Sequence, residues 1–247
     1  MRAVTQPQGG VQFYSNQSAF TAAMGVPAHV SIETFDNGLP VGPFPTTCAG
    51  PFSSSTNNAC CTSGQIVPGF AFSSTTNSDM VDVPPGFFGL GQQTRVVAAS
   101  TFAEATVATL TPAANAVAAT VYGGISSDNY TVDISVFDTS GNLLGTTTVT
   151  TGTTGTTSDS SVFAGVVSPS PIVRVEYATQ HSGGELIDNL QFRAAGPAAP
   201  GVAVAFSPSA VAANTTSNLR ITLGNQEHPG TATLGAPLVD TLPAGSA

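Results

Sequence analysis

The sequence lacks lysine and tryptophan and carries little charge of either sign. Charged residues make up 8% of the 247 residues, whereas they make up about 25% of an ordinary globular protein. Five arginines are set against 14 carboxylates, for a formal net charge of −9. This balance argues against nucleic-acid binding, which depends mainly on basic side chains that neutralise phosphates. Hydrophobic residues make up 41% and occur throughout the chain, so a sizeable core can form.

Other absences restrict the class of protein further. No apolar run approaches the roughly 18 residues that a membrane span needs. The first ten residues lack the hydrophobic segment of a signal peptide, so we expect that the signal of an exported protein has been removed. No GxSxG motif is present, and His181 beside Glu185 has no evident catalytic partner. Paired carboxylates could serve a glycosidase, but such an enzyme normally lines its cleft with aromatic side chains, and the sequence has no Trp. We therefore expect that the protein is not an enzyme.

The pattern of apolar residues favours strands. Residues 15–25 have a capping Ser, apolar residues at helical spacing and a terminal Gly, which predict one short helix. Beyond them the period becomes two, as in 132–137 and 173–177, which predicts strands with one buried face. The Gly- and Asn-bearing connection 138–142 predicts a hairpin with 143–150. Further predicted strands are 31–35, 69–72, 102–110, 116–122, 161–167 and 186–192.

Many short strands without alternating helices predict an all-β fold, an antiparallel β-sandwich or jelly roll with one short N-terminal helix. We assign this domain to residues 11–195. A Pro/Ala/Gly linker follows at 196–201. Residues 202–247 then predict a partial immunoglobulin-like β unit with strands at 202–206, 219–223 and 237–242. This unit is too small for a complete immunoglobulin-like sandwich of about 100 residues.

Several motifs resemble bacterial exoproteins of the PEP-CTERM-sorted type. They are FTAAMG at 20–25, IETFD at 32–36, VFDTSGNLLG at 136–145 and GELIDNLQF at 184–192. The resemblance covers roughly residues 11–195 and implies a secreted, jelly-roll-like domain. The segment from Cys48 to Cys60 resembles the Cys-Pro…Asn-Asp-Ala-Cys loop of the same family, which implies a Cys48–Cys60 disulfide and leaves Cys61 as the odd thiol. The tail resembles the start of immunoglobulin-like repeats of bacterial surface proteins.

The carboxylates near the predicted terminal strands suggest a cation site. Asp36 ends an early predicted strand, and Glu185 and Asp188 lie at the last one. Hard oxygen ligands suit Ca²⁺, and jelly-roll modules often use one ion to hold terminal strands together. A structural calcium at these three residues is therefore one expectation, and ordinary surface carboxylates or turn caps without any cofactor are the other.

Two functions remain open from the sequence. The first is a non-enzymatic structural or adhesive protein of a bacterial cell surface, matrix or filament, with itself or other surface proteins as partners. In this hypothesis residues 202–242 pair between molecules, because an incomplete β unit leaves unpaired strand edges. The second is a calcium-stabilised carbohydrate-binding module with a polysaccharide partner, against which the scarcity of large aromatic residues argues. Both predict a secreted or cell-surface protein.

Overall fold

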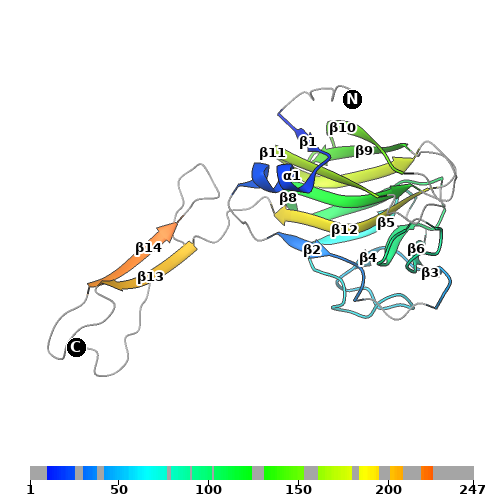
Figure 1. Cartoon of the computed structure of the whole chain (residues 1–247), viewed down its shortest axis with the longest axis horizontal. Coiled ribbons are helices and arrows are strands. Elements are labelled where there is room, and N and C mark those ends of the chain that lie inside the picture. The colour runs from blue at the N-terminus through cyan, green and yellow to red at the C-terminus, as the bar shows by residue number, and fades with distance from the viewer. Residues whose placement is uncertain are drawn as a thin grey trace. The chain divides into compact units, whose positions relative to one another are not determined.

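The computed structural model describes residues 10–25, 30–37, 42–76, 79–89, 91–101, 103–123, 131–152, 161–179, 184–194, 201–207 and 218–224. These residues form one short helix and fourteen strands (Figure 1). In chain order the elements are β1 Gln12–Tyr14, α1 Gln17–Met24, β2 Ser31–Glu33, β3 Thr46–Cys48, β4 Phe52–Ser53, β5 Phe70–Ser74, β6 Met80–Val83, β7 Val96–Ala99, β8 Thr106–Gly123, β9 Thr131–Asp138, β10 Leu143–Thr150, β11 Val162–Thr179, β12 Glu185–Ala194, β13 Gly201–Ser207 and β14 Asn218–Gly224.

The fold is an antiparallel β-sandwich, as the sequence predicts. Twelve strands form one continuous hydrogen-bonded sheet, which folds over into two layers. The two long strands β8 and β11 run through both layers. The first parts of β8 and the last parts of β11 pair with β5 and β9, and β9 continues into the edge strand β10. The other halves of β8 and β11 pair with β12 and β1. The sheet then continues through β7 and β6 to β3.

The core lies where the two layers face each other. Alternation along β9 directs Val132, Ile134 and Val136 into it, while Thr131, Asp133 and Ser135 are half-buried. Opposite them lie buried residues of β8 and β12, including Val121 and Ile187, which belong to the same apolar cluster. The predicted hairpin of β9 and β10 is confirmed, and its turn is fixed by backbone N–H groups of Ser140 and Asn142 that donate to Asp138 Oδ1.

The helix α1 covers part of an outer face. Phe20 is fully buried and packs with Ala116 and Ala118 of β8. The predicted helix is confirmed, but its cap is Asn16, because Asn16 Oδ1 accepts a hydrogen bond from the Ala19 N–H at 3.0 Å. No helix among the described residues is long and apolar enough to cross a membrane.

The chain divides into two units, Met1–Gly196 and Pro197–Ala247. The division falls at the predicted linker, although β13 begins at Gly201, inside the range assigned to that linker. In the second unit the described residues form the hairpin of β13 and β14. The two predicted strands 202–206 and 219–223 are thereby confirmed. The predicted strand 237–242 lies outside the described residues.

Candidate functional site

Two of the three predicted calcium ligands lie close to one short segment. Asp188 is fully buried, and its Oδ2 accepts a hydrogen bond from Thr94 Oγ1 at 2.6 Å. Its Oδ1 accepts from the Asn189 backbone N–H at 2.6 Å. Asp36 is exposed, and its Oδ1 accepts from the backbone N–H of Arg95 at 3.3 Å. Asp188 and Asp36 therefore contact consecutive residues, Thr94 and Arg95, in the segment before β7.

Glu185 lies on the other side of the sheet. Residues 185–188 of β12 keep a regular register with β8, so Glu185 and Asp188, three positions apart, fall on opposite faces. Glu185 is buried, and its Oε1 accepts from the Thr106 N–H at 2.7 Å. The three carboxylates do not meet at one point, and the described residues contain no group of three or more His, Cys, Asp or Glu suited to a metal ion. Bound calcium stays a prediction, tested by melting the protein with added Ca²⁺ and with chelator.

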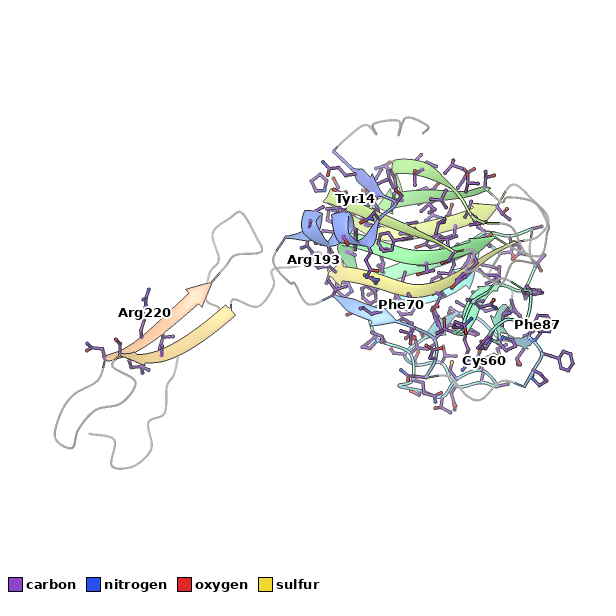
Figure 2. The ribbon with its side chains drawn as sticks, in the orientation of Figure 1. Tyr14, Cys60, Phe70, Phe87, Arg193 and Arg220 are labelled. Carbon is purple, nitrogen blue, oxygen red and sulfur yellow. A yellow bond between two sulfur atoms is a disulfide. The ribbon has the colours of Figure 1, made fainter. Side chains whose placement is uncertain are left out.

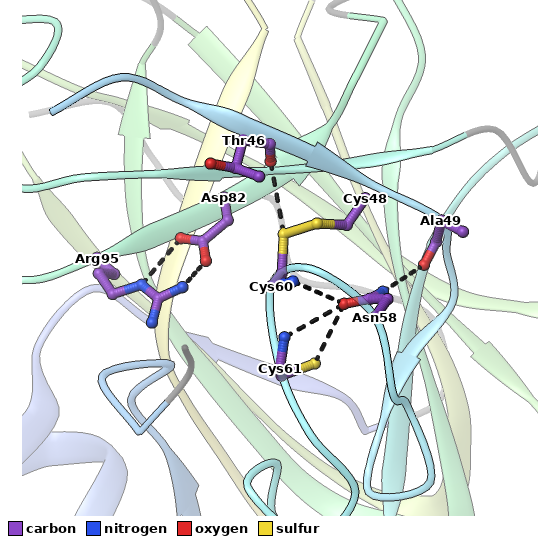
Figure 3. Close-up of a disulfide and its surroundings, with 8 residues drawn as sticks. All are labelled: Thr46, Cys48, Ala49, Asn58, Cys60, Cys61, Asp82 and Arg95. Carbon is purple, nitrogen blue, oxygen red and sulfur yellow. Dashed lines mark hydrogen bonds and ion pairs between the residues drawn. A yellow bond between two sulfur atoms is a disulfide. The ribbon is translucent and has the colours of Figure 1, made fainter. Parts of the chain in front are cut away.

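The disulfide that the resemblance implies is confirmed. Cys48 and Cys60 are joined, with their Cα atoms 6.1 Å apart, and Cys61 is a free, buried thiol (Figure 3). Asn58 holds the segment, because its Oδ1 accepts from the backbone N–H groups of Cys60 at 2.8 Å and Cys61 at 3.2 Å. Burial raises the pKa of the Cys61 thiol, which keeps it protonated and disfavours reaction.

A solvent-open recess beside the disulfide contains ionic groups. It is lined in part by Glu33, Cys61, Asp82 and Arg95. The Arg95 Nε–H donates to Asp82 Oδ1 at 3.0 Å, and the two side chains form a buried ion pair. Glu33 accepts from the backbone N–H groups of Phe35 at 2.5 Å and Val67 at 2.7 Å. Each of these charges is therefore engaged in holding neighbouring segments together.

Two exposed phenylalanines of the sandwich lie in neighbouring loops at one end. Phe44 is 69% exposed and precedes β3, while Phe87 is 39% exposed and follows β6. The antiparallel register pairs Thr46 with Asp82, so the start of β3 and the end of β6 lie together. The ring centroids of Phe44 and Phe87 are 6.2 Å apart in an edge-to-face arrangement. Figure 2 shows Phe87 projecting from that end of the sandwich.

We call Phe44, Phe87 and their flanking prolines Pro43 and Pro85 the aromatic tip. These four residues are all exposed. Phe88, half-buried beside them, packs against the apolar cluster on the outer face of β6 and β7 and lies 4.8 Å from Phe87 between ring centroids. The tip thus combines exposed rings with an anchor in the fold.

Sequence reasoning missed the aromatic tip. The phenylalanines stand in Pro- and Gly-rich stretches where no strand periodicity calls attention to them. The available signal was that residues 38–45 and 84–91 consist only of Gly, Pro, Leu, Val and Phe, although such turn-rich segments are usually polar. The tyrosines offer no comparable surface among the described residues, since Tyr122 and Tyr177 are buried and Tyr14 is partly buried. All three histidines lie outside the described residues.

Comparisons with known proteins identify no family. No protein-family model matches the chain, and no curated protein was found to be similar to it. Among the solved structures that match, two are 12% identical to this chain. The K1 cleaved adhesin domain of Lys-gingipain from Porphyromonas gingivalis W83 is matched over its whole length and 68% of this chain, with a TM-score of 0.31. The CBM22-1–GH10 modules of Clostridium thermocellum xylanase 10B, complexed with xylohexaose, are matched over 30% of their length and 70% of this chain, with a TM-score of 0.30.

Proposed function

We propose that this protein is a non-enzymatic, extracellular structural or adhesive component of a bacterial cell surface, matrix or filament. The observation that carries the proposal is the aromatic tip, because exposed large apolar groups gathered at one end of a folded domain mark a surface that binds something else. The tip would be the contact site. The sandwich would act as the rigid support that presents it.

The disulfide supports an extracellular location. Disulfides form and persist in oxidising compartments and are rare in the reducing cytosol. Cys48 ends β3, the strand that follows Phe44, so the Cys48–Cys60 bond also restrains one loop of the tip. A site restrained in this way loses less conformational entropy when it binds.

The tail supports the finer proposal that molecules assemble through residues 202–242. β13 and β14 pair with each other in one antiparallel hairpin, from Gly201 opposite Gly224 to Ser207 opposite Asn218. A two-stranded hairpin is at best marginally stable in water unless it packs against another element. A strand from a neighbouring molecule would supply that partner and extend the assembly from chain to chain.

Deletion of the residues after Gly196 tests assembly. We expect the shortened protein to be a folded monomer and the full chain to form linear oligomers, as measured by gel filtration with light scattering and by electron microscopy. A full chain that stays monomeric at high concentration, or a shortened chain that assembles equally well, would refute assembly through the tail. Adhesion of the F44S/F87S variant to cells or coated surfaces tests the contact site separately, since the tail is then intact.

The alternative is a calcium-stabilised carbohydrate-binding module, which has less support. A sugar site normally combines aromatic faces with a few placed polar groups. The segments 38–45 and 84–91 that carry the tip contain no polar side chain. A glycan-binding screen separates the two functions.

A further inference from the structure

We propose that the aromatic tip inserts into a neutral lipid surface, at the boundary between headgroups and acyl chains. This inference rests on the proposed function only in taking the tip as the contact site. It adds the chemistry of the partner, which is an apolar layer covered by zwitterionic headgroups, and it gives Phe44 and Phe87 the role of inserting groups.

The composition of the tip favours an apolar partner. The described residues around the two rings, 42–45 and 84–89, are all Gly, Pro or Phe and offer no charged side chain and no hydrogen-bonding side chain. A partner recognised by hydrogen bonds, such as a polysaccharide or a phosphorylated group, would find only backbone groups there. Transfer of apolar surface out of water needs no directional partner, so an acyl layer is the environment that these residues suit.

The exposure of the two rings and the residues that hold them also favour insertion into lipid. Phe44 and Phe87 are exposed, lie on adjacent loops and contact each other edge to face. Proline on either side of Phe44 limits the backbone of its loop, and Phe88 packs against the fold behind Phe87. The rings are therefore held outward before any contact, and Phe is among the side chains that interfacial segments bury at the boundary between headgroups and acyl chains.

The number of residues argues against a protein partner of stable affinity, including a second copy of the chain. A stable protein interface engages about 20–30 residues on each side and about ten hydrogen bonds. Two exposed rings with their flanking prolines are far fewer than that. A bilayer requires neither shape complementarity nor hydrogen bonds, so a small apolar patch can give weak, reversible attachment.

The charge of the protein selects among lipid surfaces. A chain with a formal net charge of −9 and no lysine is repelled by anionic headgroups. Attachment therefore depends on the apolar tip alone. It should be strongest on phosphatidylcholine, weaker when anionic lipid is added, and insensitive to salt on the neutral surface.

The absence of tryptophan provides a direct test. In full-length F87W protein the new indole is the only tryptophan, so its emission reports on the tip alone. With phosphatidylcholine vesicles we expect the protein to float with the lipid, its emission to shift to shorter wavelength, and brominated acyl chains to quench it. Adding F44S to F87W should lower the partition coefficient about tenfold or more, which corresponds to about 1.4 kcal/mol.

Two matched controls use apolar side chains exposed elsewhere. Ile32 is 49% exposed and Leu143 is 56% exposed, and neither belongs to the tip. I32S and L143S in the F87W background should leave vesicle binding unchanged. Melting curves confirm that each variant is folded, which is expected because all of these side chains are on the surface.

Three outcomes would overturn the inference. They are no flotation with vesicles, flotation without a change in tryptophan emission, and an emission shift produced by a soluble polysaccharide but not by vesicles. In the last case the tip is a sugar platform. If vesicles fail to bind while F44S/F87S still abolishes adhesion, the lipid inference is wrong and the proposed function stands. If adhesion is also unchanged, the tip is not the contact site.

Discussion

Glu185 is a buried carboxyl with an incomplete set of hydrogen bonds. Its Oε1 accepts from the Thr106 N–H, but its Oε2 has no partner among the described residues. Burial raises the pKa of Glu185 to about 7, and hydrogen bonds from Thr106 and from the backbone of Glu185 and Thr179 oppose that rise only in part. The folded state therefore favours the neutral carboxyl, since a buried charge without full pairing is unfavourable.

The raised pKa of Glu185 should make the stability of the folded protein depend on pH. Because the pKa is raised above its ordinary value of 4.5, the folded protein binds more protons than the unfolded chain between about pH 4.5 and 7. The free energy of unfolding should fall as the pH rises through this window, by about 3 kcal/mol in total. E185Q has no carboxyl to titrate at this position, so its free energy of unfolding should not fall through this window. Urea unfolding at about pH 5 and pH 8 measures it.

Glu176 provides the control for this change. It is partly exposed and paired with Arg174, so E176Q removes the same charge from a solvated site. The pH dependence of E176Q should follow that of the wild type. If E185Q keeps the full pH dependence, the proton taken up on folding belongs to another group.

At the scale of elements, α1 depends on one side chain. A helix of eight residues is not stable alone in water, and only Phe20 of α1 is buried. Phe20 lies directly over Gly165 of β11, where an added Cβ would come within 2.7 Å of its ring. F20A should therefore lower the free energy of unfolding by about 3–5 kcal/mol. Urea unfolding and protease cleavage at α1 measure the effect.

Two further variants, one at the contact and one on the exposed side of the helix, test this prediction. G165A should also destabilise, by about 1–3 kcal/mol, because it forces Phe20 away from the sheet. S18A changes an exposed position of the same helix and should have an effect within about 0.5 kcal/mol. Equal stability of F20A and the wild type would mean that α1 contributes nothing to the sandwich.

Sequence reasoning found strands that show alternation of apolar and polar residues or a turn signal beside them. β9, β10 and β12 show alternation or a clear turn, and their predicted ranges agree closely with the structure. β6 and β7 were missed because all four residues of each are buried, one face against the main core and the other against a second apolar cluster. Such strands show no alternation. β8 and β11 were predicted as shorter strands because Pro112, Pro169 and Pro171 read as breaks, although the long strands continue past them where they change layer.

The candidate sites were predictable only in part. The Cys48–Cys60 bond followed from a family resemblance, whereas the pairing of three cysteines cannot be fixed by spacing alone. Asp36 and Asp188 were placed near each other because the ends of the first and last strands were expected to meet. Glu185 was misplaced relative to them, since the face it occupies depends on the register of β12 with β8. The tip depends on the pairing of β3 with β6, two strands that were not predicted.

At the scale of the whole molecule, net charge should control assembly. With a formal charge of −9 and an isoelectric point near 4.3, copies repel one another at neutral pH. Acidification toward the isoelectric point, or added salt, should therefore increase the light scattering of the full chain as tails come together. The protein ending at Gly196 is a close control, because residues 197–247 contain one arginine and two carboxylates and their removal changes the net charge by one unit. Equal scattering from both proteins would indicate precipitation that does not involve the tail.

The position of β12 also has a mechanical consequence. β12 leads from the sandwich toward the linker, and Figures 1 and 2 show its arrowhead at the opposite end of the sandwich from Phe87. Tension between a tail held in a filament and a tip held on a surface would pull β12 along its own axis. Its hydrogen bonds with β8, from Glu185 to Ala194, would then be loaded in shear and would share the force. We therefore expect a higher unfolding force when the chain is pulled from its two ends than when β12 is peeled away bond by bond.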